Sequence, residues 1–198
     1  WTRVWMDAFQ PMRFGRRLWV VPSWHDTPEP DAVNLRLDPG LAFGTGTHPT
    51  TALCLEHLDA MPSMPERVLD FGCGSGVLAL AALALGAKYA DGTDIDPQAL
   101  IAMQDNAKRN GVSDQIQTYL ADAFEPAEPY ELVMANILSG PLVELADELQ
   151  GHVAPGGTLV LSGLLTEQAG EVMQAYPSLT FQAPKSLDGW CRLVGQKT

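Results

Sequence analysis

The stretch "LDFGCGSGVLAL", Leu69–Leu80, decides the fold that we predict for this chain. A short apolar run ends at Phe71, and glycines follow at three alternate positions, Gly72, Gly74 and Gly76. The residues after them are apolar and continue as a helix-like segment. A glycine-rich turn between a strand and a helix is the setting in which α/β proteins bind nucleotides. The stretch therefore predicts a ligand-binding loop at the edge of a β-sheet.

Strand-like and helix-like segments alternate outward from this stretch along most of the chain. We expect strands at 67–71, 89–96, 116–122, 131–138, 157–163, 179–184 and 190–197, and helices at 48–61, 76–87, 97–111, 140–153 and 166–176. This alternation predicts an α/β fold with a doubly wound, mostly parallel, seven-stranded Rossmann-like sheet. The last two strands are close enough to pair as a terminal antiparallel hairpin. In such sheets, ligands bind at the carboxyl ends of the strands.

The first 37 residues have a different pattern. Segments 16–24 and 32–40 are predicted as strands on either side of a proline-rich turn. We interpret 1–37 as a linker remnant and a short N-terminal β extension that packs on, or extends, the main domain at 38–198. Because the chain begins with Trp1 and not with Met, we expect it to be a fragment of something longer.

Composition excludes several classes of function. The chain has 198 residues, 46% of them hydrophobic, and a formal net charge of -12. Its longest apolar run, Val77–Leu85, is far shorter than the roughly 20 residues of a membrane span. Lys and Arg form no cluster in the body of the chain, so we expect neither a nucleic-acid nor a membrane partner. The three scattered cysteines indicate a reducing cytoplasm, and the four scattered histidines predict no metal site. The oligomeric state stays open.

Two interpretations of the glycine stretch compete. From Gly74 to Ala79 it fits the dinucleotide pattern GxGxxG/A, with Asp94 about twenty residues further on. Taken from the strand end, Asp70-x-Gly72-x-Gly74 is instead the pattern of methyltransferases that use S-adenosylmethionine. A carboxylate at Asp70 suits the cationic ammonium and sulfonium of that cofactor and hinders a pyrophosphate, which favours methyl transfer. Asp94 can accept hydrogen bonds from the ribose hydroxyls in either case. Three alternatives remain: a nicotinamide-dependent oxidoreductase, a non-catalytic cofactor-binding module, and a methyltransferase that acts on another protein amine or on a small molecule.

The segment "MANIL", Met134–Leu138, ends another strand and carries the predicted chemistry. An amine that accepts a methyl group must be neutral, and a free lysine has a pKa of about 10.4, so the site must orient and deprotonate it. The side-chain carbonyl of Asn136 and the main-chain carbonyl of Asn136 or Ile137 can accept its N–H bonds and direct its lone pair. Asp122, which ends the strand at 116–122, is placed to accept a hydrogen bond from an adenine amino group.

A second glycine-rich stretch, "DPGLAFGTGTHPTT", spans Asp38–Thr51. It has no lysine after its glycines, so it is not a phosphate loop of the GxxxxGK[ST] type. Gly44 and Gly46 permit movement or positive φ, and Thr51 belongs to the first helical turn, where free N–H groups can receive a carboxylate. We interpret the stretch as a candidate lid over the methyl-donor end of the cofactor.

Together, "FGTGTHPTT", "LDFGCGSGVLA", "GTDIDPQA", "NAKRNGV" and "ANILSGPL" resemble the PrmA family, bacterial methyltransferases of the eleventh large-subunit ribosomal protein. The resemblance covers essentially the whole chain and implies a class I methyltransferase sheet. It implies S-adenosylmethionine-dependent methylation of lysine ε-amino groups and an N-terminal α-amino group. It also implies cofactor contacts at Thr51, Gly72, Asp94 and Asn136, and a loop over the cofactor at Phe43, Gly44, Thr45 and His48.

The family carries an N-terminal substrate-recognition domain, and this chain starts at about the linker that follows it. We therefore expect the chain to bind S-adenosylmethionine but to methylate the ribosomal protein poorly compared with a full-length enzyme. Equal turnover by the two proteins in a radiolabelled-methyl assay would contradict the second part of this expectation.

Overall fold

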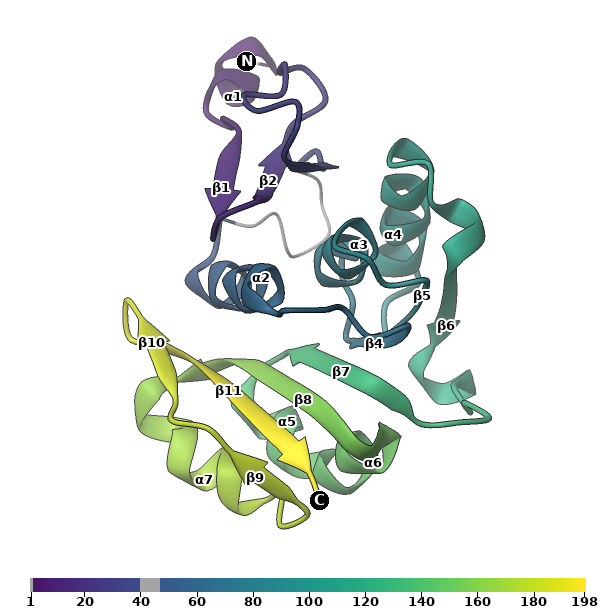
Figure 1. Ribbon diagram of the computed structural model, residues 1–198, viewed down its shortest axis with the longest axis vertical. Helices are drawn as coiled ribbons and strands as arrows, with labels where there is room; N and C mark the ends of the chain where they lie inside the picture. The colour runs from purple at the N-terminus through teal and green to yellow at the C-terminus, as the bar shows by residue number, and fades with distance from the viewer. Residues whose placement is uncertain (1, 40–46) are drawn as a thin grey trace.

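The computed structural model describes residues 2–39 and 47–198, and its largest element is a mixed β-sheet (Figure 1). The strands of this sheet are β4 (Arg67–Phe71), β5 (Tyr89–Asp94), β6 (Ile116–Leu120), β7 (Tyr130–Asn136), β8 (Val153–Leu165), β9 (Leu179–Phe181), β10 (Lys185–Leu187) and β11 (Trp190–Lys197). Their order is β10-β11-β8-β7-β4-β5-β6, and β9 also pairs with β11. The strands from β8 to β6 are parallel, whereas β11 is antiparallel to each of its neighbours. The predicted doubly wound sheet is thus confirmed.

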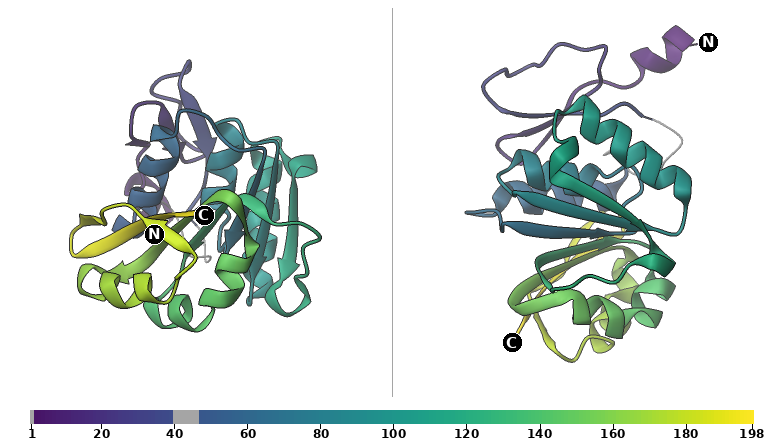
Figure 2. Two further views of the ribbon diagram at one scale, coloured as in Figure 1. Left: turned by 60° about the horizontal axis from the view of Figure 1, so that its bottom comes forward. Right: turned by 90° about the vertical axis from the view of Figure 1, so that its right-hand side faces the viewer.

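Helices cover both faces of the sheet and make a three-layered molecule (Figure 2). One face carries α2 (Pro49–Ala60), α3 (Val77–Ala84) and α4 (Pro97–Arg109); the other carries α5 (Ser139–Glu144), α6 (Ala146–His152) and α7 (Ala169–Gln174). The sheet separates two clusters of buried apolar side chains, one under each helical layer. Because β4 and β7 are buried on both faces, apolar residues stand next to one another in them, at 68–69 and 132–135, and do not alternate with polar ones.

Two details of the predicted fold are wrong. The described residues place eight strands in the main sheet, not seven, because β10 forms a short edge strand where a turn was expected. The helix predicted at 140–153 is two helices, α5 and α6, which meet at Leu145, whose φ of -97° and ψ of 13° are not helical. Both differences depend on local backbone geometry that hydrophobic periodicity does not report.

The N-terminal segment forms a small sheet of its own and does not extend the main one. It contains β1 (Met12–Phe14), β2 (Leu18–Val21) and β3 (Val33–Arg36), in the order β1-β2-β3, after the short helix α1 (Thr2–Asp7). Neither α1 nor β1 was predicted. Phe14, Leu18 and Leu35 belong to the same buried cluster as the side chains of α2 and α3. The two sheets therefore share one hydrophobic core.

A buried carboxylate connects the two sheets. Asp59 of α2, only 5% exposed, accepts hydrogen bonds from the backbone N–H groups of Arg16, Arg17 and Leu18, at 2.6, 3.1 and 3.1 Å. Gly15 makes this approach possible because a Cβ at its position would overlap the Asp59 carboxylate. A single α2 side chain therefore fixes the β1–β2 turn on the main domain.

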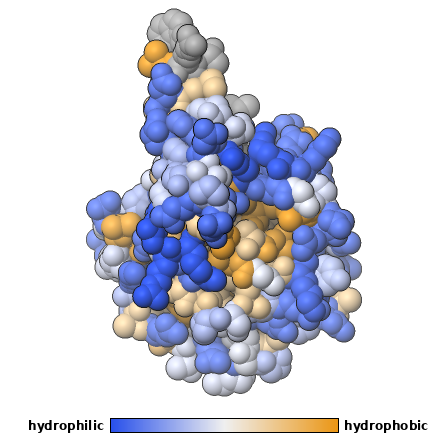
Figure 3. Space-filling view, turned by 45° about the horizontal axis from the view of Figure 1, so that its top comes forward, coloured by the Kyte–Doolittle hydropathy of each residue, from blue (hydrophilic) through white to orange (hydrophobic). Residues whose placement is uncertain are grey.

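Hydrophilic and apolar side chains are unevenly distributed on the face drawn in Figure 3. On the face in Figure 3, hydrophilic side chains surround a hollow in which apolar ones gather. Every helix in residues 2–39 and 47–198 is too short or too polar to cross a membrane. The same residues contain no cluster of His, Cys, Asp and Glu that is able to hold a metal ion. The three cysteines, Cys54, Cys73 and Cys191, are buried free thiols.

Candidate functional site

A cavity of about 590 Å³ lies at the carboxyl end of the parallel strands. Six of the residues singled out in the sequence line it: His48, Gly72, Gly74, Asp94, Asn136 and Ile137. They come from four separate segments, namely the start of α2 and the ends of β4, β5 and β7. The parallel order of the strands brings these ends together at one edge of the sheet, as the sequence predicted.

The glycine loop, Gly72–Gly76, forms one wall of the cavity. Gly72 has a φ of +73°, and a Cβ at its position would come within 2.5 Å of the Ile137 side chain. Only glycine accepts both this conformation and this close approach. The N–H groups of Gly72 and Cys73 donate to the Thr93 carbonyl oxygen at 2.8 and 2.9 Å. The loop backbone is thereby tied to the end of β5.

Asp94 ends β5 beside the loop. Its Oδ2 accepts a hydrogen bond from the Gly74 N–H at 3.0 Å, and its Oδ1 accepts one from the Asp96 N–H at 3.0 Å. These two bonds fix the orientation of the carboxylate, and Asp94 lines the cavity. Because each carboxylate oxygen has a second lone pair, the group can still accept hydrogen bonds from a pair of hydroxyls.

Asp70 does not line the cavity, in contrast to the expectation that it meets a cationic ligand directly. Its carboxyl group is 2% exposed beneath α3, where Oδ2 accepts a hydrogen bond from the Ala79 N–H at 3.1 Å. Burial raises the pKa of Asp70 from 3.8 to about 7, and the Asp94 charge adds to the increase. Since Gly76 offers no side chain to cap α3, Asp70 supplies a hydrogen-bond acceptor to its first turn.

Asn136 ends β7 and presents an unpaired acceptor. Its Nδ2 donates to Thr51 Oγ1 at 3.3 Å, which orients the amide group. Its Oδ1 is buried from solvent and has no hydrogen-bond partner among the described residues. A buried amide oxygen without a partner is disfavoured unless a ligand supplies the missing donor. Thr51 itself does not line the cavity but holds Asn136 in position.

The main chain after Asn136 follows the cavity wall. The Ile137 N–H donates to the Ser162 carbonyl oxygen at 3.2 Å. Gly163 has a φ of +90° and lines the cavity, and a Cβ at its position would overlap the carbonyl oxygen of Ile137. The Ile137 carbonyl therefore lies against Gly163, a residue of the cavity wall.

His48 caps the N-terminus of α2. Its Nδ1 accepts a hydrogen bond from the Thr50 N–H at 3.3 Å, and its ring lies edge-on to Trp190, with the ring centroids 4.7 Å apart. Pro49 follows in the first helical turn, as predicted. His48 thus lines the cavity and fixes the start of α2 as well.

The remaining predicted residues divide into two groups. Asp122 lies in the short 3-10 helix η2 (Ala121–Ala123), is exposed, and does not line the cavity, whereas its neighbour Ala121 does. Phe43, Gly44 and Thr45 lie outside the described residues, as does most of the candidate lid.

The sequence analysis missed most of the apolar lining. Trp190, Leu138 and Ile95 line the cavity, and Leu138 and Ile95 are also 68% and 87% exposed. Ile95 and Leu138 lie at the ends of the strands predicted at 89–96 and 131–138, so their position was a usable signal. No local signal points to Trp190, because only the pairing of β11 with β8 brings it to this edge. The site as a whole combines an apolar cavity with a few oriented oxygen acceptors, a composition typical of small-molecule sites.

Comparison with known proteins assigns the family. The model described as "Ribosomal protein L11 methyltransferase (PrmA)" matches residues 1–198. The chain belongs to the PrmA family.

Curated relatives and a crystal structure agree with this assignment. The chain is 62% identical over 196 residues to a ribosomal protein L11 methyltransferase of Azotobacter vinelandii, covering 98% of this chain and 67% of the relative. It is 60% identical over 198 residues to one of Pseudomonas paraeruginosa, covering 100% and 67%. The chain thus spans about two thirds of the length of these PrmA relatives. A ribosomal protein L11 methylase of Lactobacillus delbrueckii subsp. bulgaricus superposes with a TM-score of 0.84 at 32% identity, covering 96% and 100%.

More distant structures show the fold alone. An RNA methyltransferase of Salinibacter ruber, solved with S-adenosyl-L-homocysteine, superposes with a TM-score of 0.56 at 22% identity and covers 73% of this chain and 88% of its own. This PrmA-family chain therefore has an α/β methyltransferase fold.

Proposed function

We propose that this chain transfers methyl groups from S-adenosylmethionine to amino groups of ribosomal protein L11, the lysine ε-amines and the N-terminal α-amine. The names of its close relatives support the substrate. The observation that carries the proposal is the Asn136 Oδ1, a buried acceptor without a partner among the described residues, at the end of β7 on the cavity wall. A positioned amine supplies the donor that this oxygen lacks.

The residues around the cavity fit the cofactor. The apolar lining and the volume of about 590 Å³ suit a nucleoside-sized ligand. The absence of a side chain at Gly72 lets Ile137 pack against the glycine loop on the cavity wall. We assign the ribose hydroxyls to Asp94, the backbone of Gly72 and Gly74 to one wall of the binding site, and the adenine end to the side of Ala121 and Asp122.

The bound cofactor supplies a methyl group that its sulfonium has already activated. The chain then has to position the amine and receive its hydrogen bonds. Asn136 Oδ1 accepts one N–H bond and the Ile137 main-chain carbonyl accepts a second. When these two oxygens accept the two N–H bonds of the neutral amine, its lone pair is left to point at the methyl group, as attack requires. Thr51 contributes by holding the Asn136 amide in place.

We further propose that residues 38–198 form the cofactor-binding catalytic domain and that residues 1–37 support it. The hydrogen bonds of Asp59 to residues 16–18 and the shared core support this division.

Mass spectrometry of ribosomal protein L11 tests the proposal. The protein is incubated with this chain and S-adenosylmethionine, with Asn136→Ala as the test variant and Gln115→Ala, which removes a surface hydrogen bond to Lys88, as the matched control. We expect methyl addition with the wild type and the control and little with Asn136→Ala. Calorimetry with S-adenosylhomocysteine shows whether each protein binds cofactor. Transfer by Asn136→Ala at the wild-type rate contradicts the assigned role.

A further inference from the structure

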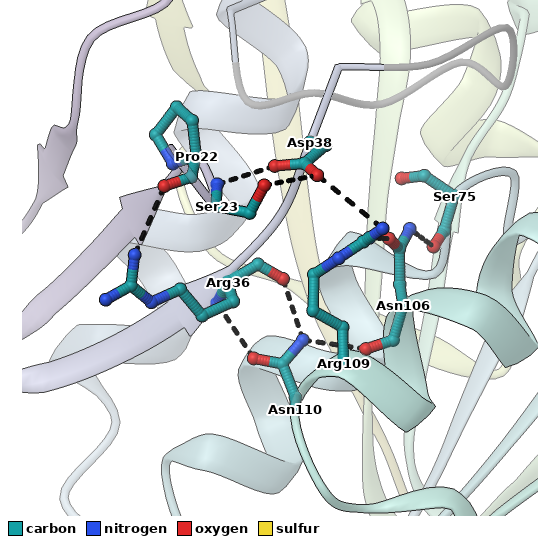
Figure 4. A network of polar contacts seen from close by, with 8 residues as sticks. All are labelled: Pro22, Ser23, Arg36, Asp38, Ser75, Asn106, Arg109 and Asn110. Carbon is teal, nitrogen blue, oxygen red and sulfur yellow. Dashed lines mark hydrogen bonds and ion pairs between the residues drawn. The ribbon is translucent and has the colours of Figure 1, made fainter. Parts of the chain in front are cut away.

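The segment Asn106–Asn110, the last turn of α4 and its C-cap residue, is part of a sequence motif that the proposed chemistry does not explain. Its side chains form a polar network that runs from the glycine loop to the N-terminal sheet (Figure 4). None of these α4 residues lines the cavity. Among residues 2–39 and 47–198, the network reaches the site through the glycine loop.

Asn106 is the link to the glycine loop. It is 6% exposed, and its Nδ2 donates a hydrogen bond to the Ser75 carbonyl oxygen at 2.9 Å. Met103, one turn earlier on the same face of α4, packs against the loop so closely that a Cβ at Gly76 would come within 2.5 Å of its Cγ. Gly76 gives α3 no side-chain cap, so contacts from outside the loop hold this junction.

Arg109 extends the link outward. Its Nη1 donates to the Asn106 Oδ1 at 2.7 Å, and its Nη2 lies 3.5 Å from the Asp38 carboxylate. Asp38 in turn accepts hydrogen bonds from the N–H and Oγ of Ser23, at 2.6 and 2.8 Å. A guanidinium bonded to the amide oxygen of Asn106 fixes which end of that amide faces Ser75.

Asn110 makes a parallel connection to β3. Its Oδ1 accepts from the Arg36 N–H at 2.8 Å, and its Nδ2 donates to the Arg36 carbonyl oxygen at 2.7 Å. The Asn110 side chain thereby makes the two hydrogen bonds that a neighbouring strand would make to Arg36 at this edge of the small sheet. The position of α4 is thereby set by β3.

We propose that Asn106, oriented by Arg109 and Asp38, is a positioning residue for the glycine loop, through which the N-terminal sheet sets cofactor affinity. This inference rests on the proposed function, because it assumes that the loop binds S-adenosylmethionine. The loop contributes backbone groups to the site, and a displaced backbone cannot be compensated by another rotamer. Ordering the loop before binding lowers the conformational entropy lost when the cofactor binds.

Three variants and one matched control test the proposal. Asn106→Ala removes the donor to Ser75, whereas Arg109→Met and Asp38→Asn weaken the orientation of Asn106 from a distance. The control is Gln104→Ala, which removes a hydrogen bond from the same helix to Thr118 of β6 and leaves the loop alone. We expect the Kd of S-adenosylhomocysteine to rise about tenfold in Asn106→Ala, equivalent to about 1.4 kcal/mol, and not to change in Gln104→Ala.

Kinetics and hydrogen exchange distinguish positioning from a general loss of stability. The KM for S-adenosylmethionine rises in Asn106→Ala while kcat changes less. Without cofactor, amide exchange at residues 72–76 becomes faster in this variant than in Gln104→Ala. If Asn106→Ala does not fold, Arg109→Met and Asp38→Asn test the proposal instead. Each should raise the Kd about threefold, and the variant that carries both changes should raise it by less than the product of the two effects.

The outcomes distinguish a failure of the proposed function from a failure of the positioning role of Asn106. Failure of the wild-type chain to bind S-adenosylhomocysteine refutes the proposed function. Normal binding by the wild type together with wild-type Kd values in the folded variants refutes only the positioning role. Equal losses of affinity in Asn106→Ala and Gln104→Ala refute it too.

Discussion

Replacing Asp70 by Asn should remove a pH-dependent component of the folding free energy. The Asp70 carboxyl group is buried beneath α3, and burial raises its pKa from 3.8 to about 7. Asn has nearly the same shape and keeps an oxygen that accepts from the Ala79 N–H, but it cannot ionise. The variant therefore separates the charge of the group from its hydrogen bond.

The sign of the effect follows from the raised pKa. Below about pH 4 the carboxyl group is protonated in both the folded and the unfolded chain. Between about pH 4 and pH 7 the folded chain keeps a proton that the unfolded chain has lost, so the free energy of unfolding falls as pH rises. At about 1.4 kcal/mol per pH unit, the loss reaches about 4 kcal/mol by pH 8.

Urea unfolding of the wild type, Asp70→Asn and Asp105→Asn at several pH values between 4 and 8 measures this component. Asp105 is exposed on α4 and controls for the loss of one negative charge. The free energy of unfolding of Asp70→Asn minus that of the wild type should increase steadily from its value at pH 4 as the pH rises through 7. A stability difference that stays constant with pH refutes the reasoning, because Asp70 would then titrate as it does in the unfolded chain.

Three further predictions concern the cavity and the junction between the sheets. In Gly163→Ala the added Cβ forces the Ile137 carbonyl away, so the rate of methyl transfer should fall about a hundredfold. Calorimetry should show that the affinity for S-adenosylhomocysteine changes little. An unaltered rate would exclude this carbonyl as an acceptor. Asp94→Asn places an amide N–H against either the ligand or the Gly74 N–H, so the affinity for S-adenosylhomocysteine, measured by calorimetry, should fall about ten- to a hundredfold. Unchanged binding would rule out the ribose contact. Asp59→Ala removes the acceptor of three backbone N–H groups at 16–18, of which that of Leu18 is buried, and this should lower the free energy of urea unfolding by about 3 kcal/mol. A loss below about 1 kcal/mol would show that this contact is only peripheral.

Residues adjacent in sequence to a strand end were predicted well. Gly72, Asp94 and Asn136 each follow or end an apolar strand, and parallel pairing places all three at one edge. The order of elements and the gathering of these residues at one edge of the sheet could therefore be inferred from periodicity and spacing alone.

The direction of a side chain at such an end could not be inferred. Asp70 was expected in the cavity, but α3 covers it, and its hydrogen bond to Ala79 holds it there. Successive residues of a strand point to opposite faces, so a shift of one position decides whether a carboxylate meets ligand or core.

The amino-acid order is enough to establish the alternation of strands and helices, the two glycine-rich stretches and the polar residue types at each strand end. These are local properties, set by burial and by backbone permissiveness. Only the tertiary structure decided that Trp190 joins the cavity, that the first strands form a separate sheet, and that Asn106 reaches Ser75. Each of these contacts joins residues distant in the chain, and their positions depend on how the layers pack against one another.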